Sequence, residues 1–149
     1  MAENIPPHHT SGLTDEAIAS LSERAAEVAQ HAYAPYSGFR VGAALLLTSG
    51  EIVTGCNVEN ASYRLTTCAE QSAVVAAVSQ YGPGIKLRAV AVTNLNSAAS
   101  QPCGACRQTM LEFSTPETWI FYPAANGEIA DASMAAMLPA AFHLHSQTS

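Results

Sequence analysis

The stretch YRLTTCAEQSAVVAAV, residues 63–78, joins a polar segment to an apolar one. Its second half predicts a helix packed in the interior of the protein, with Val74 and Val75 among the buried positions. Cys68 and Glu70 nevertheless stand at the first turn of this helix. Burying a carboxylate beside apolar side chains is costly unless the group has partners or a use. We therefore expect a functional site where this helix begins.

Strands and helices alternate on both sides of this helix. Before it, two apolar runs separated by the turn TSGE predict a hairpin of strands at 40–47 and 52–58. After it, the continuous apolar run at 87–93 predicts a strand buried on both faces. A helix at 104–113 and a strand at 118–122 follow. This order predicts an α/β fold whose helices cover both faces of one sheet.

The two ends of the chain are simpler. Residues 1–12 contain two prolines and the pair His8–His9, and predict a flexible tail to which we assign no metal. Residues 13–149 form a single domain. Its first helix is capped by Thr14 and has one inward face, made of Ile18, Leu21, Ala25, Val28 and Ala32. A turn at 126–127, a short strand near Ile129 and a short helix at 133–138 close the domain.

Composition limits the kinds of function. Of the 149 residues 48% are hydrophobic and 12% charged, and the formal net charge is −6. Lys86 is the only lysine and the arginines are scattered, which argues against a large nucleic-acid surface and favours a small-molecule substrate. A surface so poor in charge also suggests that part of it is buried in an oligomer.

The chain has no recognisable secretion signal or membrane span. Its N-terminus lacks an apolar run after a basic start, and no apolar stretch is long enough to cross a bilayer. We therefore expect a cytoplasmic protein with no membrane contact. In that compartment the four cysteines are expected to be thiols or metal ligands rather than disulfides.

Three of the cysteines lie where helices are predicted to begin. Cys68 precedes the helix described first, and Cys103 and Cys106 form the motif PCGAC at the start of another. Free amides and the positive end of the helix dipole stabilise thiolates at such positions. If the two helix starts meet, three thiolates can bind one zinc ion and leave its fourth position open, as in catalytic sites.

Other interpretations of the cysteines remain open. The C-x-x-C pair is also typical of thiol redox proteins, which would leave Cys68 and Glu70 without a use. A second alternative is that Cys56 completes a four-cysteine structural zinc site, although its place within a predicted strand favours a small buried side chain. The third alternative is that all four cysteines are ordinary core residues. The spacing favours metal ligation.

Glu70 adds a proton carrier to the three thiols. A zinc ion lowers the pKa of a bound water, and a neighbouring carboxylate can relay its protons. The order CAE followed by PCGAC matches the pattern of zinc nucleobase deaminases.

The chain resembles the small, homotetrameric cytidine deaminases that bind zinc through three cysteines. The resemblance runs from Tyr33 to Phe142 and rests on five segments: YAPYSGFRVGAALL, GCNVENASY, CAE, PCGACRQ and MLPAAF. It implies a three-layer α/β/α sandwich with a central mixed five-stranded sheet and one zinc per subunit. It also implies hydrolysis of cytidine and 2′-deoxycytidine to uridine and 2′-deoxyuridine with release of ammonia, in pyrimidine salvage.

The resemblance implies a role for each matched residue. Cys68, Cys103 and Cys106 would hold zinc and Glu70 would be the acid–base. Asn57 and Glu59 would bind the ribose, and Phe39 would pack against the pyrimidine. Ala61, Tyr63 and Phe142 would reach the active site of a neighbouring subunit, so that the tetramer shares its sites. The remaining implied substrate contact is Ala69.

One position departs from the family pattern. Many tetrameric relatives have an arginine directly after the catalytic glutamate, where it helps to neutralise the thiolates, but this chain has Gln71. Three thiolates on one dication leave a net negative centre, which attracts water less strongly. Arg64 and Arg107 are the candidates to supply the missing charge, and helix amides are the alternative.

The sequence leaves three alternatives to cytidine deamination. The first is a deaminase of another aminated pyrimidine nucleoside such as blasticidin S, and the second a non-catalytic zinc or thiol module. The third is deamination within a polynucleotide, which the acidic composition disfavours.

Overall fold

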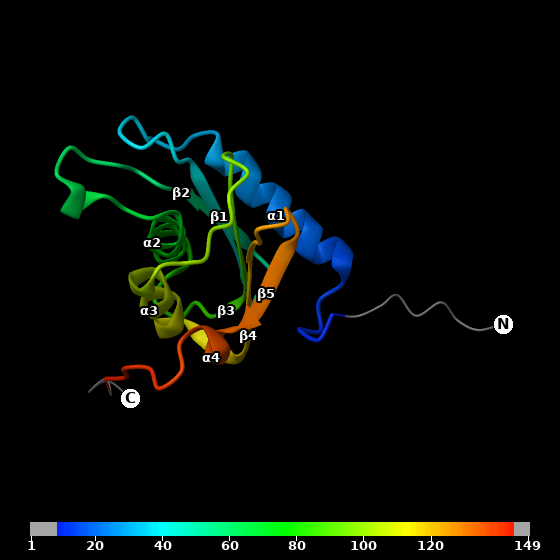
Figure 1. Ribbon diagram of the computed structural model, residues 1–149. Helices are drawn as coiled ribbons and strands as arrows, with labels where there is room; N and C mark the ends of the chain where they lie inside the picture. The colour runs from blue at the N-terminus through cyan, green and yellow to red at the C-terminus, as the bar shows by residue number, and fades with distance from the viewer. Residues whose placement is uncertain (1–8, 145–149) are drawn as a thin grey trace.

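The computed structural model describes residues 9–144, whose five strands form one mixed sheet in the order β2-β1-β3-β4-β5 (Figure 1). The strands are β1 (Val41–Leu47), β2 (Ile52–Cys56), β3 (Leu87–Asn94), β4 (Ser114–Pro123) and β5 (Ile129–Ser133). The helices are α1 (Asp15–Ala29), the 3₁₀ turn η1 (Tyr63–Leu65), α2 (Ala69–Tyr81), α3 (Gly104–Glu112) and α4 (Met134–Met137).

The pairing of the strands explains the mixed character of the sheet. β1 pairs antiparallel with both β2 and β3, and β4 pairs antiparallel with β5. β3 and β4 are parallel, because α3 lies between them in the chain and returns it to the same end of the sheet. The predicted central mixed five-stranded sheet is confirmed.

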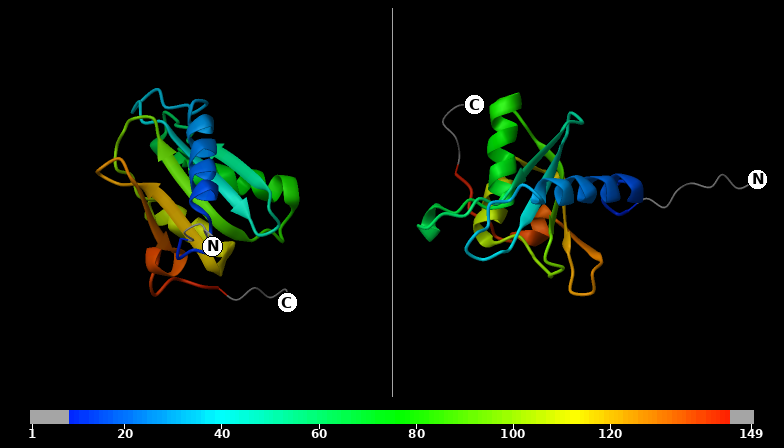
Figure 2. Two further views of the ribbon diagram at one scale, coloured as in Figure 1. Left: turned by 90° about the vertical axis from the view of Figure 1, so that its right-hand side faces the viewer. Right: turned by 90° about the horizontal axis from the view of Figure 1, so that it is seen from above.

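Helices cover both faces of this sheet, which makes three layers. α1 packs on one face and α2 on the other, as the two views of Figure 2 show. Successive residues of β1 alternate between the two cores: Ala44 belongs to the cluster under α1, and Ala43 and Leu45 to the cluster under α2. The α/β/α sandwich expected from the sequence is therefore present.

Two glycines let the helices approach the sheet closely. A Cβ atom on Gly42 would lie 1.9 Å from the carbonyl oxygen of Ala25 in α1. One on Gly55 would lie 2.3 Å from the backbone nitrogen of Ala73 in α2. Any side chain at Gly55 would push α2 away from β2, so this glycine helps to fix where the first turn of α2 lies.

Several boundaries differ from the expectations. Val75 is 65% exposed, so its predicted burial is wrong: α2 turns this valine away from the sheet while Val74 faces it. α1 ends at Ala29, which is fully buried, whereas Val28 is only half-buried. β2 ends at Cys56, which is thus the last residue of an edge strand and is half-buried.

The described part of the predicted tail is packed against the domain. The His9 ring lies edge-on to Trp119 and Phe121, with centroid distances of 5.3 and 5.6 Å, and its Nε2 is 2.8 Å from Oδ2 of Asp131. The Ser11 carbonyl accepts a hydrogen bond from Arg88. His8 lies outside the described residues. Between residues 9 and 144, none of the helices combines the length and apolar character needed to cross a membrane.

Candidate active site

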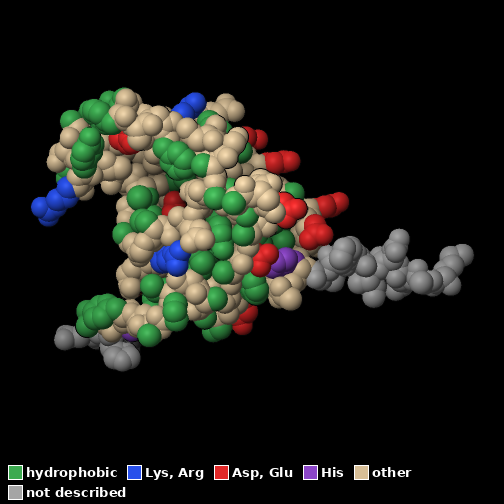
Figure 3. All heavy atoms as spheres, viewed as in Figure 1, with side chains coloured by type: hydrophobic (Ala, Val, Ile, Leu, Met, Phe, Trp, Pro, Cys, Tyr) green, Lys and Arg blue, Asp and Glu red, His purple; other side chains and the backbone are tan. Residues whose placement is uncertain are grey.

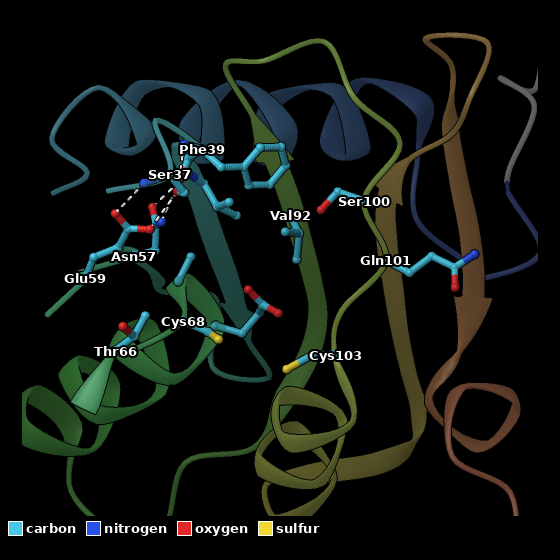
Figure 4. Close-up of a pocket in the computed structure, with 13 residues that line it drawn as sticks. Ser37, Phe39, Asn57, Glu59, Thr66, Cys68, Val92, Ser100, Gln101 and Cys103 are labelled. Atoms are coloured by element: carbon cyan, nitrogen blue, oxygen red, sulfur yellow. Dashed lines mark hydrogen bonds between the residues drawn. The ribbon is translucent and has the colours of Figure 1, made fainter. Parts of the chain in front are cut away.

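A cavity of about 220 Å³ opens where the first turns of α2 and α3 face the segment before β1 (Figure 4). Of the residues that the sequence predicted, those lining it are Phe39, Asn57, Glu59, Cys68, Ala69, Glu70 and Cys103. They come from four separate segments of the chain. The cavity therefore has a metal end, where the sulfurs lie, and a mouth, where Phe39 and Glu59 lie (Figure 4).

Helix starts build the metal end, as the sequence indicated. Cys68 is the N-cap residue of α2, Cys103 is the N-cap residue of α3, and Cys106 lies in the first turn of α3. Their three sulfur atoms all lie within 4.8 Å of one another. In a tetrahedral zinc site with Zn–S bonds of about 2.3 Å, the sulfurs are about 3.8 Å apart. The donor set and its spacing therefore fit one zinc ion.

The fourth cysteine does not join this group. Within the described residues, the cluster of metal-ligating side chains contains Cys68, Cys103 and Cys106 and not Cys56. The interpretation as a four-cysteine structural site is wrong. Gly55 faces α2, and because side chains alternate along a strand, that of Cys56 lies on the opposite face of the sheet. Cys68 also lies beside the C-x-x-C pair, so the pair is not an isolated redox motif.

The three thiols strongly influence one another. A hydrogen bond from the Cys106 thiol is the main cause that lowers the pKa of Cys68 to about 7. The same hydrogen bond, followed by burial, raises the pKa of Cys106. The backbone N–H of Cys106 also donates to the Cys103 sulfur at 3.4 Å. Of these two thiols, Cys68 therefore loses its proton more readily than Cys106.

Glu70 is a buried acid beside the sulfurs. Only 4% of it is exposed, in the first turn of α2, and it lines the cavity. Burial raises the pKa of this carboxyl group, and a hydrogen bond from Cys106 opposes the rise. A raised pKa makes the carboxylate a stronger base, which suits acid–base chemistry.

The mouth of the cavity is built from hydrogen bonds to loops. Oε1 of Glu59 accepts from the backbone N–H groups of Tyr36 and Ser37 at 3.0 and 3.2 Å, and Oε2 accepts from the Ser37 hydroxyl at 2.6 Å. The Ser37 hydroxyl bond is the main cause that lowers the pKa of Glu59. This carboxylate is thus charged and held in place at the cavity wall.

Asn57 connects β2 to the same loop. Its Oδ1 accepts from the Val41 N–H and its Nδ2 donates to the Phe39 carbonyl, both at 2.8 Å. Only 9% of Asn57 is exposed. An amide carries two N–H donors, so one remains for a ligand in the cavity.

Besides Cys106, which is buried within the sulfur cluster, three predicted residues do not line this cavity. Tyr63 is 80% exposed in η1, Phe142 is 70% exposed after α4, and Ala61 lies in the segment before η1. Their expected place is the site of a neighbouring subunit, which stays a prediction. Gln108 of α3 holds the Phe142 carbonyl through its Nε2 at 3.2 Å.

Neither candidate arginine is hydrogen-bonded to a sulfur among the described residues. The Arg107 guanidinium donates to the carbonyls of Pro102 and Met137 at 2.8 and 2.9 Å. Arg64 lies in the exposed turn η1. The two helix N-termini that carry the cysteines are the positive groups observed beside the thiolates.

Several lining residues were missed in the sequence. They are Ser37, Val41, Thr66, Val92, Ser100 and Gln101. Ser37 lies in the stretch YAPYSGF, where the nearby Pro35 and Gly38 indicate a loop. Ser100 and Gln101 immediately precede the PCGAC motif, so their closeness to Cys103 in the sequence could have predicted that they line the site.

Known proteins provide a separate comparison. The family model of the cytidine and deoxycytidylate deaminase zinc-binding region matches residues 15–122. A cytidine deaminase from Mycobacterium tuberculosis is 45% identical over 124 residues, which are 83% of this chain and 88% of the relative. The chain belongs to this family. A cytidine deaminase from Halalkalibacterium halodurans is 40% identical over 122 residues, 82% of this chain and 91% of the relative.

Solved structures of the family agree with the fold. The crystal structure of cytidine deaminase from Burkholderia pseudomallei has a TM-score of 0.76 and 42% identity, and covers 87% of this chain and 100% of its own. That of Mycobacterium tuberculosis has a TM-score of 0.74 and 42% identity, covering 85% and 97%. The predicted family and fold are confirmed, and the chain carries a zinc-binding deaminase domain. These findings do not favour a non-catalytic zinc or thiol module.

Proposed function

We propose that the protein is a zinc-dependent cytidine deaminase, which hydrolyses cytidine and 2′-deoxycytidine to uridine and 2′-deoxyuridine with release of ammonia. One zinc ion per chain would be held by Cys68, Cys103 and Cys106. The observation that carries this proposal is the buried Glu70 carboxyl group, which shares one cavity with the metal end. The relatives named cytidine deaminase support the choice of substrate.

Zinc, when bound, supplies Lewis acidity that lowers the pKa of a coordinated water. Glu70 then does the proton transfers. Its carboxylate takes a proton from the attacking water and gives it to N3 of the cytosine ring, while the water oxygen bonds to C4. It next takes the remaining water proton and delivers it to the amino group, whose bond to C4 breaks as ammonia leaves. Burial raises the pKa of Glu70, which favours uptake of the water proton by its carboxylate.

The mouth of the cavity would bind the rest of the nucleoside. Glu59 and the free N–H of Asn57 would hydrogen-bond the ribose hydroxyl groups, and the Phe39 ring would pack on the pyrimidine. Ala69 is the first residue of α2, so its backbone N–H has no acceptor within the helix and can donate to the base.

The charges around the cavity favour a nucleoside over a nucleotide. Its lining contains two carboxyl groups, Glu59 and Glu70, and neither lysine nor arginine. A substrate phosphate would meet a negative wall without a cation to bind it. We therefore assign the nucleoside, rather than deoxycytidylate or a polynucleotide, as the substrate.

We also propose that the chain works as a homotetramer with shared active sites. Large apolar side chains are exposed on the segments that flank the cavity: Tyr63 80%, Leu65 64%, Val75 65% and Phe142 70%. Figure 3 shows hydrophobic side chains gathered on the two projecting parts that flank the hollow on its left side. A second copy of the chain would bury these side chains and bring Phe142, Tyr63 and Ala61 to its neighbour's site. Light scattering should give about four times the chain mass of 15.5 kDa.

The cytoplasm is the compartment that suits such a site. All four cysteines are free thiols, and a three-thiolate zinc site needs an environment in which thiols stay reduced. Pyrimidine salvage would use the uridine formed there.

A cytidine assay combined with zinc analysis of the same sample tests the proposed function. We expect one zinc per chain and loss of the cytidine absorbance at a typical enzymatic rate, about 1–10³ turnovers per second. Deoxycytidine should react at a comparable rate, and deoxycytidylate, blasticidin S and single-stranded DNA much more slowly. A zinc-loaded protein that leaves cytidine unchanged would overturn the proposal.

A further inference from the structure

Asn96, in the loop after β3, pairs with the backbone on both sides of Phe39. Its Oδ1 accepts from the Arg40 N–H and its Nδ2 donates to the Gly38 carbonyl, both at 3.1 Å. Asn96 itself is exposed and does not line the cavity. One amide group thus holds the residue before Phe39 and the residue after it, which fixes both the position and the direction of this segment.

The segment depends on such contacts because it belongs to no helix or strand. β1 begins only at Val41. The Phe39 N–H donates to the Ser37 hydroxyl at 3.0 Å, and Asn57 binds the Phe39 carbonyl and the Val41 N–H. Together with Asn96, these side chains occupy most of the polar backbone groups around Phe39. Backbone hydrogen bonds add two contacts beside the ring: the Arg40 carbonyl accepts from the Leu95 N–H at 3.0 Å, and the Gly38 N–H donates to the Ala34 carbonyl at 2.9 Å. The remaining groups on both sides of Phe39 depend on the side chains.

Gly38 makes the contribution of Asn96 specific. This glycine has a φ of 69°, in the left-handed region, where a residue without a side chain moves between conformations at little cost. The hydrogen bond from Asn96 to the Gly38 carbonyl stops that movement at the residue directly before Phe39.

The loop that presents Asn96 is itself held in shape. Oδ1 of Asn94 accepts from the N–H groups of Asn96 and Ala98 at 3.0 and 3.2 Å, and its Nδ2 donates to the Ala98 carbonyl at 2.8 Å. The same loop continues to Ser100 and Gln101, which line the cavity, and then to Cys103. Asn96 therefore ties the Phe39 segment to the loop that leads into the metal end.

We propose that Asn96 is a positioning residue for the deaminase reaction, which keeps the Phe39 ring in place to pack on the pyrimidine. This inference rests on the proposed function. Asn96 acts at a distance from the reacting atoms, so it affects how well the nucleoside is bound more than how fast its C–N bond breaks. In the Asn96→Ala protein, water can hydrate the freed Arg40 N–H and Gly38 carbonyl, and the fold stays intact.

Kinetics of Asn96→Ala test the proposal. We expect the KM for cytidine to rise about fivefold, as the loss of exposed hydrogen bonds implies, with kcat within about twofold of wild type. The melting temperature should change by about 1 °C or less. Asn126→Ala is the matched control: Asn126 is also exposed and makes two hydrogen bonds, both to Glu128, at the tip of the β4–β5 hairpin. It should leave KM and kcat unchanged.

A second variant separates positioning from a general structural effect. In a Phe39→Ala background there is no ring to position, so adding Asn96→Ala should change KM by less than about 1.5-fold. An unchanged KM for the single variant, or an equal KM effect with and without the ring, would overturn the role of Asn96 while cytidine turnover by wild type still upheld the proposed function. A wild-type protein without cytidine turnover would overturn both.

Discussion

The two ends of the cavity are constructed in opposite ways. At the metal end, Cys68, Glu70 and Cys103 stand on the first turns of helices that the hydrophobic core fixes against the sheet. At the mouth, Phe39 and Glu59 lie in segments without regular structure and are held by side chains that hydrogen-bond to loops.

This difference separates two kinds of residue. In the proposed reaction each side chain at the metal end acts through its own chemistry, and the position of its backbone is secured by packing. At the mouth the position is the weak point, so residues that never touch the substrate become important. Substitutions at the metal end should therefore stop the reaction, whereas those at the mouth should weaken substrate binding by moderate factors.

Removing a zinc ligand should have the largest effect. In Cys103→Ser the metal set loses one of three thiolates, and because Cys103 is exposed, the fold should survive. We expect loss of bound zinc and a fall in cytidine turnover of about 10⁴-fold or more, since the Lewis acid is lost. Zinc analysis and the cytidine assay measure the two effects.

Cys56→Ser is the control for that experiment. Cys56 is a free, half-buried thiol that lies outside the sulfur cluster. This variant should keep one zinc per chain and its activity. Loss of zinc from Cys56→Ser would restore the four-cysteine interpretation and remove the distinction between a catalytic and a structural site.

Glu70→Gln should have the next largest effect, and only on the chemical step. The amide is nearly the same size but cannot carry a proton, and general acid–base groups contribute about 10²–10⁴ in rate. We expect kcat to fall about 10³-fold while zinc content and KM stay close to those of wild type. Equal turnover by the two proteins would exclude Glu70 from the proton transfers and leave the metal end without an acid–base group.

Acidification should weaken the metal end before it affects the mouth. Zinc binds thiolates, so protons compete with it. The pKa of Cys106 is raised, so its proton competes already at neutral pH, and Cys68 adds a second proton once the pH falls below its pKa of about 7. Zinc affinity should fall about tenfold per pH unit for each protonated thiol, which for Cys68 alone is about 100-fold between about pH 7 and about pH 5. The pKa of Glu59 is lowered, so its charge persists over this range.

Competition with a coloured zinc chelator at several pH values measures this dependence. A zinc affinity that stays constant on acidification would show that proton uptake by Cys68 is not coupled to metal binding. Circular dichroism at each pH confirms that the protein remains folded.

The sequence was informative about the metal end for a physical reason. Ligand chemistry is restricted to few residue types, and a helix start fixes the spacing of Cys68 and Glu70 and of Cys103 and Cys106. The strand pattern likewise predicted the sheet, because burial on both faces of β3 leaves a continuous apolar run. The pattern was ambiguous about which side of α2 faces solvent: residues 73–78 are all apolar, and this run alone does not show that Val75 is exposed.

The mouth was less predictable because its contacts join segments far apart in the chain. The resemblance supplied Phe39, Asn57 and Glu59, but nothing in the local pattern indicates that Ser37 binds Glu59, or that Asn96 binds the backbone of Gly38. Asparagine and serine are common in loops for local reasons, so their presence alone does not predict a long-range hydrogen bond.

Ser37→Ala should have the smallest effect, and it tests whether substrate binding at the mouth depends on how Glu59 and Phe39 are held in position. The Ser37 hydroxyl donates to Glu59 at 2.6 Å and accepts from the Phe39 N–H at 3.0 Å, so one oxygen links the group proposed for the ribose to the ring proposed for the base. In Ser37→Ala both links are lost, although backbone N–H groups still hold Oε1 of Glu59. We expect the KM for cytidine to rise about threefold to tenfold, with kcat within about twofold.

Ser49→Ala is the matched control, because the Ser49 hydroxyl, like that of Ser37, donates to a glutamate. Its partner is Glu51, and both residues lie in the turn between β1 and β2, outside the cavity. If Ser37→Ala lowered kcat and left KM unchanged, Ser37 would act on the chemical step. The distinction between a metal end that does the chemistry and a mouth that positions the substrate would then fail. If both serine variants raised KM equally, the effect would come from a general loosening of the domain, since Ser49 has no contact with the substrate site. A rise in KM confined to Ser37→Ala would locate the effect at the mouth, where Ser37 lines the cavity and holds Glu59 and Phe39.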